Sequence, residues 1–268
     1  MELKVYDLEK KSTGAVKLPS QFEEAYHPDL IKRAVHALQS KARQTYGASP
    51  DAGMRHSSKL SKRRRKYRGS YGFGISRVNR KILSRRGTRF FWVGAFSPQT
   101  VGGRRSHPPK AEKNWIKKIN KKENQKAIRS AMAATLNKIL VEERGHKIPV
   151  EYPLVLKSDF ENLQRTKDVQ SVLEKLGFNA EIERSSVVKV RAGIGKRRGR
   201  KYRKRKGVLV VVSEDCPVMK SVRNIAGFDI VPVNQLNAEL LAPGAMAGRA
   251  TLWTEGAIAK LEKERYFA

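Results

Sequence analysis

The clearest signal for the fold is VLVVV, residues 208–212. Five apolar residues in succession, four of them valine, favour a β-strand. Because the run is continuous rather than alternating, it predicts a strand buried on both faces, as in parallel sheets covered by helices. Shorter runs of the same kind occur as LKVY at residues 3–6, PLVL at 153–156 and IVPV at 230–233.

Between these runs lie three segments with the period of amphipathic helices. Residues 28–46 open with a proline suited to a first helical turn. A second helix is expected over residues 128–145 and a third over residues 166–177, where Gly177 suits the C-terminal cap. The alternation predicts an α/β fold of doubly wound type, with a three-layer, largely parallel sheet and flanking helices. A mixed α+β sheet is the alternative.

The composition indicates the kind of partner and excludes several kinds of site. The 268 residues carry a formal net charge of +32, from 57 Lys and Arg against 25 Asp and Glu, which predicts a polyanionic partner, above all nucleic acid. One cysteine, Cys216, excludes an intrachain disulfide and a thiolate zinc site. No apolar run reaches the length of a membrane span or a signal core, so a cytoplasmic protein is expected.

The positive charge is concentrated in two acid-free zones. Residues 52–111 hold seventeen Lys and Arg, and residues 184–213 hold twelve, with no Asp or Glu in either zone. The rest of the chain is nearly balanced. These zones predict a globular α/β domain of residues 1–47 and 111–268, with residues 48–110 inserted as a long, extended basic loop.

The inserted segment shows no sustained helical or strand period, yet it holds seven of the chain's aromatic residues. One interpretation is that Lys and Arg neutralise phosphates while exposed rings stack on unpaired bases, as RNA-binding proteins do. The other is that the rings form a small satellite core. Mutual repulsion among so many cations favours folding coupled to binding.

Catalytic patterns are not found in the sequence. The five histidines form no HExxH motif, and Gly193, Gly195 and Gly199 fit neither dinucleotide-binding nor P-loop spacing. Cys216 fits a buried structural thiol at a strand end better than a nucleophile. We therefore expect a protein that is not an enzyme and has no cofactor or metal, with a nucleic-acid-modifying α/β enzyme such as a methyltransferase as the alternative.

Several motifs follow one another in an order and spacing that resemble a known family. They are GGRRSHPPKAEK at 102–113, RSAMAATLNKIL at 129–140, GRKYR at 199–203, RNIAG at 223–227, LAPG at 241–244 and LWTEGAI at 252–258. The likeness covers nearly the whole chain and is to the large-subunit ribosomal protein four family, in its archaeal and eukaryotic-like form. The chain lacks the long C-terminal extension of eukaryotic relatives, which favours an archaeal source.

The resemblance implies a structural constituent of the large ribosomal subunit. It implies a primary rRNA-binding protein, important in early subunit assembly, that contacts several rRNA domains and whose loop forms part of the polypeptide exit tunnel wall. The implied partners are large-subunit rRNA of the 23S type, neighbouring large-subunit ribosomal proteins and the nascent polypeptide, with no membrane. The implied location is the ribosome in the cytoplasm.

The charge pattern and the resemblance together select candidate site residues. We expect RNA contacts from Lys62, Arg63, Arg64, Arg65, Lys66, Arg68, Tyr71, Arg77, Arg80, Arg85, Arg86, Arg89, Arg104, Arg105, His107, Lys110, Lys196, Arg197, Arg198, Arg200, Lys201 and Arg203. Residues 75–100 depart most from the family pattern, with bulky side chains at Phe90, Phe91 and Trp92. Within them, the tunnel-lining residues are expected to be Asn79, Leu83, Arg86 and Phe91.

Overall fold

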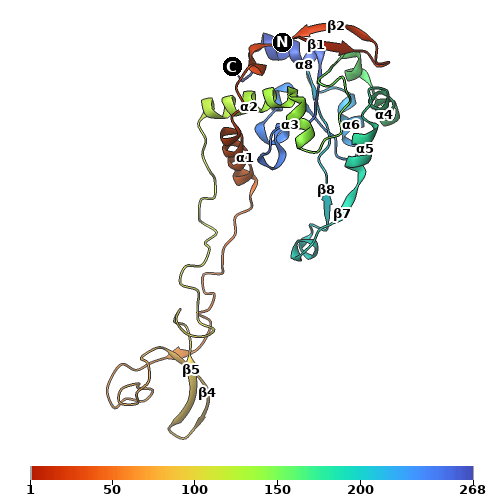
Figure 1. Ribbon diagram of the computed structural model, residues 1–268. Helices are drawn as coiled ribbons and strands as arrows, with labels where there is room; N and C mark the ends of the chain where they lie inside the picture. The colour runs from red at the N-terminus through yellow and green to blue at the C-terminus, as the bar shows by residue number, and fades with distance from the viewer. Residues whose placement is uncertain (1, 268) are drawn as a thin grey trace. The chain divides into compact units, whose positions relative to one another are not determined.

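The computed structural model describes residues 2–267, which form two compact units. One unit, here called the body, consists of Met1–Ala42 and Ile116–Ala268. The other, here called the basic unit, is Arg43–Trp115 and is inserted between two helices of the body (Figure 1).

A six-stranded sheet forms the centre of the body. The strands lie in the order β10 (Asp229–Pro232), β9 (Leu209–Val212), β11 (Thr251–Thr254), β6 (Val155–Leu156), β1 (Glu2–Tyr6) and β2 (Ser12–Lys17). Every neighbouring pair is parallel except β1 and β2. The predicted α/β fold with a largely parallel sheet is confirmed.

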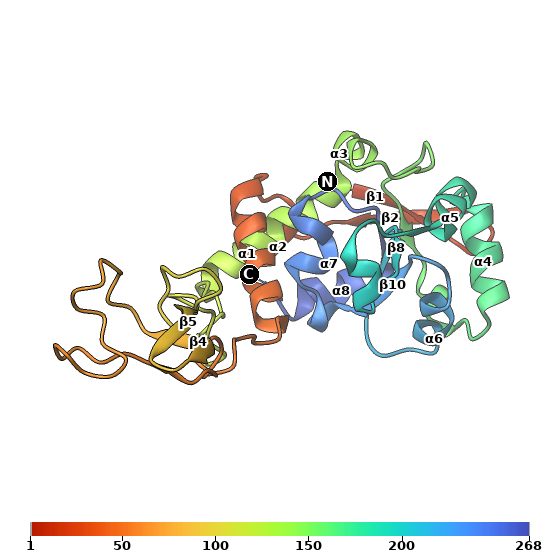
Figure 2. The same ribbon diagram turned by 90° about the horizontal axis from the view of Figure 1, so that it is seen from below.

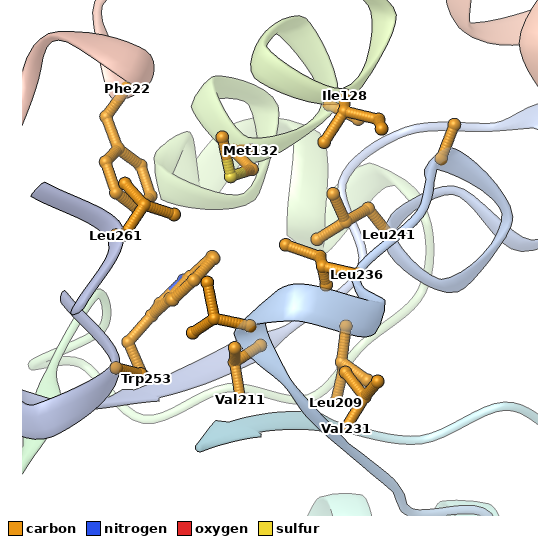
Figure 3. Close-up of a cluster of buried hydrophobic side chains, with 14 of the residues drawn as sticks. Phe22, Ile128, Met132, Leu209, Val211, Val231, Leu236, Leu241, Trp253 and Leu261 are labelled. Carbon is orange, nitrogen blue, oxygen red and sulfur yellow. The ribbon is translucent and has the colours of Figure 1, made fainter. Parts of the chain in front are cut away.

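Helices cover both faces of this sheet. On one face the buried cluster joins Leu209 and Val211 to side chains of α1 (Pro28–Ala42), α2 (Lys121–Leu136), α7 (Ala238–Leu241) and α8 (Glu255–Lys263). Figure 3 shows its members from α2, α7 and α8. On the other face Val210 and Val212 meet side chains of α3 (Lys138–Glu143), α4 (Thr166–Lys175) and α6 (Val218–Arg223). VLVVV thus supplies alternate side chains to two cores, which is why its apolar run is continuous.

Several boundaries differ from the predicted ones. The first helix ends at Ala42 instead of residue 46. The second is divided at Asn137, which is extended and whose Oδ1 accepts from the backbone N–H groups of Ile139 and Leu140 at 3.1 and 3.5 Å. An asparagine cap of this kind starts a new helix, α3. Gly177, with φ of 94°, follows the end of α4 as expected.

The remaining elements of the body are short. They are α5 (Asn179–Ser186), the antiparallel ribbon of β7 (Val188–Val190) and β8 (Tyr202–Lys204), and 3-10 helices at Ser20–Phe22, Ser158–Asn162, Ile194–Arg198, Val233–Gln235 and Pro243–Ala245. The ribbon can be followed in Figure 1, and Figure 2 shows α4, α5 and α6 together at one side of the body. Among the described residues, none of the helices has the length and hydropathy of a membrane span.

The basic unit contains a small antiparallel sheet, in the order β3 (Ser58–Lys59), β4 (Arg80–Arg86) and β5 (Arg89–Gly94). The sequence did not predict these strands, because the segment shows no sustained strand period. Gly87 has φ of 58° at the first position of the two-residue turn, where glycine is favoured. Leu83 lies where the β4–β5 register shifts.

Candidate nucleic-acid interface

The run at residues 62–68 forms a tight, highly charged loop. The N–H of Ser61 donates to the carbonyl of Arg68 at 3.1 Å, and the N–H of Gly69 donates to the carbonyl of Lys66 at 2.9 Å. The side chains of residues 62–66 are all exposed, and no acidic residue lies in the loop. Five consecutive exposed cations without a carboxylate partner suit a run of phosphates.

The β4–β5 hairpin carries the next group of predicted contacts. Arg85, Arg86 and Arg89 are exposed near its turn, and Arg85 Nη1 donates to the Tyr67 hydroxyl at 2.9 Å. This hydrogen bond ties the hairpin to the 62–68 loop. The predicted tunnel-lining residues also lie here: Leu83, Arg86 and Phe91 are exposed, whereas Asn79 is half-buried.

Arg80 differs from the other predicted contacts because its side chain is buried, with 9% exposed. Its guanidinium donates to the Val78 carbonyl at 3.3 Å and to Ser76 Oγ at 3.0 Å, and it lies over the Trp92 ring at 5.4 Å. Through these contacts Arg80 stabilises the start of β4. Its RNA contact stays a prediction that this placement does not favour.

Aromatic rings in the basic unit serve both of the roles considered from the sequence. Phe90 contacts Tyr67 edge-on at 5.2 Å and Trp92 at 5.4 Å, which makes a small cluster. Phe73, by contrast, is 71% exposed, and Phe91 on the opposite side of β5 is 49% exposed. One set of rings stabilises the unit, and another is available to a partner.

Cations cover many of these rings. Arg77 lies 4.4 Å from the centre of Tyr71, and Arg104 lies 5.7 Å from that of Phe96. Cation–π contacts of this kind stabilise a side chain by about 0.5–1 kcal/mol at exposed sites. In a unit almost without carboxylates, the rings fix guanidinium groups without neutralising them.

The two limbs of the basic unit lie side by side near its ends. The N–H of Ala48 donates to the Pro109 carbonyl at 2.8 Å, and a Cβ at Gly53 would lie 2.7 Å from Arg104 Cα. An open cavity of about 790 Å³ lies beside this contact, lined in part by the predicted residues Arg105, His107 and Lys110.

Two aromatic residues at this cavity were missed by the sequence analysis. Tyr46 and Trp115 stack with ring centres 4.8 Å apart, and Arg43 lies 4.5 Å from the Trp115 ring. Lys113 lies on the same ring at 4.7 Å. Tyr46 and Trp115 are almost seventy positions apart, so no local pattern could have paired them.

The middle of the second acid-free zone forms the β7–β8 ribbon of the body. Its predicted contacts Lys196, Arg197, Arg198, Arg200, Lys201 and Arg203 are all exposed. Strand pairing places Lys189 opposite Arg203 on one face and Val190 opposite Tyr202 on the other. The sequence predicted charge and flexibility here, and the structure adds a defined two-stranded scaffold.

Buried ionic groups hold the start of this ribbon. Glu181 is fully buried and accepts from Arg184 Nε and Nη2 at 2.7 and 2.6 Å, from the Lys147 N–H at 2.9 Å and from His146 Nδ1 at 2.7 Å. Arg184 Nη2 also donates to the Lys206 carbonyl at 2.7 Å, at the end of the ribbon.

Burial and hydrogen bonding set the charge states in this cluster. Burial acts to raise the pKa of Glu181, but hydrogen bonds from Arg184, His146 and Lys147 outweigh it and lower that pKa below its usual value. Burial lowers the pKa of His146 despite the neighbouring carboxylate. Glu181 is therefore ionised and His146 neutral at pH 7, with His146 Nδ1–H donating to the carboxylate.

A second ion pair joins the buried Arg249 to the half-buried Asp229. Arg249 is fully buried and donates from Nη2 to Asp229 Oδ2 at 2.6 Å and from Nε to the Gly207 carbonyl at 2.9 Å. Lys206 Nζ reaches the same carboxylate oxygen at 2.9 Å. Lys206 and Gly207 lie within three residues of the end of β8, so both ionic clusters fix the end of the ribbon.

The described residues contain no group of His, Cys, Asp and Glu arranged to hold a metal ion. Cys216 is half-buried rather than fully buried as expected, and burial, with the nearby Glu161 and Asp215, raises the pKa of its thiol to about 11. A protonated thiol is a poor nucleophile at neutral pH.

Comparison with known proteins identifies the family. Residues 16–264 match the model of the ribosomal protein L4/L1 family. The chain belongs to this family. Its members are structural components of the ribosome and not enzymes, which confirms the resemblance and excludes the methyltransferase alternative.

Relatives with full-length similarity are found in archaea. A protein of Nanoarchaeum equitans named large ribosomal subunit protein uL4 is 50% identical over 268 residues, covering 100% of both chains. A protein of the same name from Methanococcus vannielii is 46% identical and covers 99% of this chain and 100% of its own length. One from Archaeoglobus fulgidus is 46% identical, with 96% and 97% covered.

Proposed function

We propose that this chain is a structural constituent of the large ribosomal subunit and binds 23S-type rRNA through the basic unit and the β7–β8 ribbon. The observation that carries the proposal is the row of exposed cations at residues 62–66, without any acid, in a chain that matches large-subunit proteins over its whole length. Its location is the ribosome in the cytoplasm.

Two separate cationic surfaces support contact with more than one rRNA domain. One surface lies in the basic unit, where residues 48–110 would be the RNA-penetrating loop, and the other lies on the ribbon of the body. A protein that contacts several rRNA domains at once can hold them together while the subunit forms. This supports a role as a primary binder in early subunit assembly, beside neighbouring ribosomal proteins.

The salt dependence of RNA binding tests this function. Changing Lys62, Arg63, Arg64 and Arg65 together to glutamine removes four exposed cations. Each lost contact with single-stranded phosphate reduces the slope of log affinity against log salt by about 0.7, so the slope should fall by up to about 3. The measurement is the affinity of the full chain for an rRNA fragment at several salt concentrations.

A matched variant controls for net charge. Lys10, Lys11, Lys157 and Lys260 each pair with a carboxylate of the body, at 3.0, 3.0, 2.8 and 2.5 Å. Changing these four to glutamine alters the total charge equally but should leave the slope nearly unchanged. Equal slopes for the two variants would show that the loop cations do not bind phosphates.

The exit tunnel is the second part of the proposal. Leu83, Arg86 and Phe91 are exposed on the β4–β5 hairpin, and Leu83 is 65% exposed at the register shift. Exposed side chains of mixed polarity on a rigid hairpin suit a wall that nascent chains pass without binding tightly. The nascent polypeptide would then be a transient partner.

Photocrosslinking tests the tunnel position. A photoreactive amino acid at Leu83 or Phe91 should crosslink to a stalled nascent chain in assembled ribosomes. The same amino acid at Ile139 of the body, which is 67% exposed, serves as the control and should give no such product. Crosslinks from Leu83 and Phe91 to rRNA alone would contradict the tunnel proposal and leave rRNA binding intact.

A further inference from the structure

A cavity of about 640 Å³ lies within the basic unit, between the 62–68 loop and the β4–β5 hairpin. Its walls come from residues 63–75 and 88–92, and its rings are Tyr67, Tyr71, Phe73, Phe90 and Trp92. The volume falls in the range of about 300–1,000 Å³ that is usual for small-molecule sites. Several flat rings around one hollow suit a flat aromatic ligand.

One of these rings is free to stack. Arg68 lies over Tyr67 at 5.6 Å, Arg77 over Tyr71 at 4.4 Å and Arg80 over Trp92 at 5.4 Å. Phe90 packs against Tyr67 and Trp92. Phe73 has no ring or cation partner among the described residues and is 71% exposed. It is therefore the open platform at the edge of the cavity.

The charged side chains of the cavity lining are all cations, which donate hydrogen bonds, and the hydroxyl groups of Tyr67, Tyr71 and Thr88 can donate or accept. Arg63, Arg65, Lys66, Arg68 and Arg89 contribute cations, and no carboxylate or amide side chain lies in the wall. The Nε–H of Arg68 is buried and has no acceptor among the described residues. A buried donor without a partner carries a cost, which a ligand that brings an acceptor removes.

The backbone around the cavity is held in an unusual shape. Arg65 and Arg68 have φ of 52° and 60°, in the left-handed region that residues other than glycine seldom adopt. The Arg85–Tyr67 hydrogen bond at 2.9 Å fixes the loop against the hairpin. Strained backbone concentrates at ligand sites, where the surrounding structure holds it in place.

We propose that this cavity binds one unpaired nucleotide of rRNA, with its base stacked on Phe73 and its flanking phosphates held by Arg63 and Arg65. The proposal rests on the proposed function, because it assigns a nucleotide site to the same rRNA-binding unit. Stacking on an aromatic side chain is the usual way to hold a base that has left a helix.

The donor-rich wall also selects the base. Arginine and lysine pair with the acceptor atoms O6 and N7 of guanine, whereas adenine is read by asparagine or glutamine and cytosine by carboxylates. The wall has the first kind of side chain and neither of the others. The preferred ligand is therefore an unpaired guanine.

Binding of the full chain to short RNA hairpins tests the site. Four hairpins carry a single bulged G, A, C or U, and a fifth is fully paired. The chain should bind the bulged-G hairpin about tenfold more tightly than the paired one, within the range for one base stacked on one ring. Equal affinities for the bulged-G and paired hairpins would overturn the proposal, and equal affinities for all four bulges would overturn the choice of guanine.

Variants show whether the Phe73 ring causes the preference for the bulged-G hairpin. Phe73→Ala should abolish the preference for bulged G, and Phe73→Tyr should retain it because the ring remains. Val101→Ala, which trims a fully exposed side chain of the same unit outside the cavity, should also retain it. A preference that survives in Phe73→Ala would overturn the proposal.

The salt dependence separates this site from the proposed function. Steep salt-dependent binding to every hairpin without any bulge preference overturns the nucleotide site and leaves rRNA binding intact. Binding to none of the hairpins and to no rRNA fragment overturns rRNA binding itself. The two failures therefore give different results in one titration.

Discussion

The body and the basic unit differ in the groups that their cationic side chains contact. All the ion pairs between cationic side chains and carboxylates in residues 2–267 lie in the body. In the basic unit, guanidinium groups lie on aromatic rings or are exposed. An ion pair neutralises a cation within the protein. A cation–π contact orients the cation without neutralising it, so its charge stays available to a partner.

The two units also differ in how they are stabilised. The body buries two apolar clusters, one on each face of its sheet. The basic unit buries few apolar side chains, and its strands consist largely of exposed residues. We therefore expect stability to depend on the body and RNA affinity to depend mainly on the basic unit.

The largest expected effect comes from the core of the body. Trp253 is 1% exposed and contacts Phe22 edge-on at 5.0 Å (Figure 3). Trp253→Ala should lower the free energy of unfolding by about 4 kcal/mol because it leaves a large cavity. Trp92→Ala in the basic unit should change it by about 1 kcal/mol or less. Urea unfolding followed by circular dichroism measures both, and equal losses would contradict the division.

A buried charge of the body gives the next largest effect. Glu181→Gln should cost about 3 kcal/mol at pH 7, because Arg184 then loses its buried counter-charge. Exposed Glu262→Gln is the matched control and should cost almost nothing. Urea unfolding at pH 7 compares the two, and similar costs would show that the buried cluster adds no stability.

The stability lost in Glu181→Gln should also depend on pH. A carboxylate whose folded pKa is lowered stabilises the fold above its unfolded pKa, near 4.5 for glutamate, and this stability is lost as pH falls through the folded value. The difference between wild type and Glu181→Gln should therefore shrink below pH 4.5. A difference that is constant down to pH 3 would contradict the lowered pKa.

The ribbon is a cationic part of the body, so it shows how much of the RNA affinity lies outside the basic unit. Arg197, Arg198, Arg200 and Arg203 are exposed, so changing them together to glutamine should weaken rRNA binding about tenfold or more, as expected when several phosphate contacts are lost. The melting temperature should barely move, since surface substitutions are nearly neutral. An unfolded variant would mean that these arginines stabilise the body.

The smallest expected effect is local to the hairpin. Gly87 has φ of 58° and open space around it, so Gly87→Ala costs only backbone strain, about 1 kcal/mol. Amide hydrogen exchange in β4 and β5 should become faster, while global unfolding is unchanged. Gly14→Ala, which has open space and no positive φ, is the control.

The sequence predicted the parts of the fold whose signal is local. VLVVV indicated a central strand because each of its side chains enters a core. The strand β11 was missed because TLWT has only two apolar residues between threonines. The β4–β5 hairpin was missed because its strands are mostly exposed and β4 is interrupted at Leu83, although the Gly87–Thr88 pair is a recognisable turn signal.

The candidate site was predictable in its charges and not in its geometry. Acid-free stretches are visible in the sequence, so the exposed cations were found. The exception is Arg80, which the fold uses internally. The cluster of His146, Glu181 and Arg184 and the pairing of Tyr46 with Trp115 join distant positions. Only the folded chain brings such residues together.

Removing residues 54–103, which form most of the basic unit, tests whether stability and RNA binding are divided between the two units. Because Gly53 and Arg104 lie in contact, residues 54–103 can be replaced by two glycines without stretching the chain. We expect the shortened protein to unfold with the same free energy as the full chain and to bind an rRNA fragment with a much shallower salt slope. An unfolded product, or an unchanged slope, would contradict the division of stability and RNA binding between the two units.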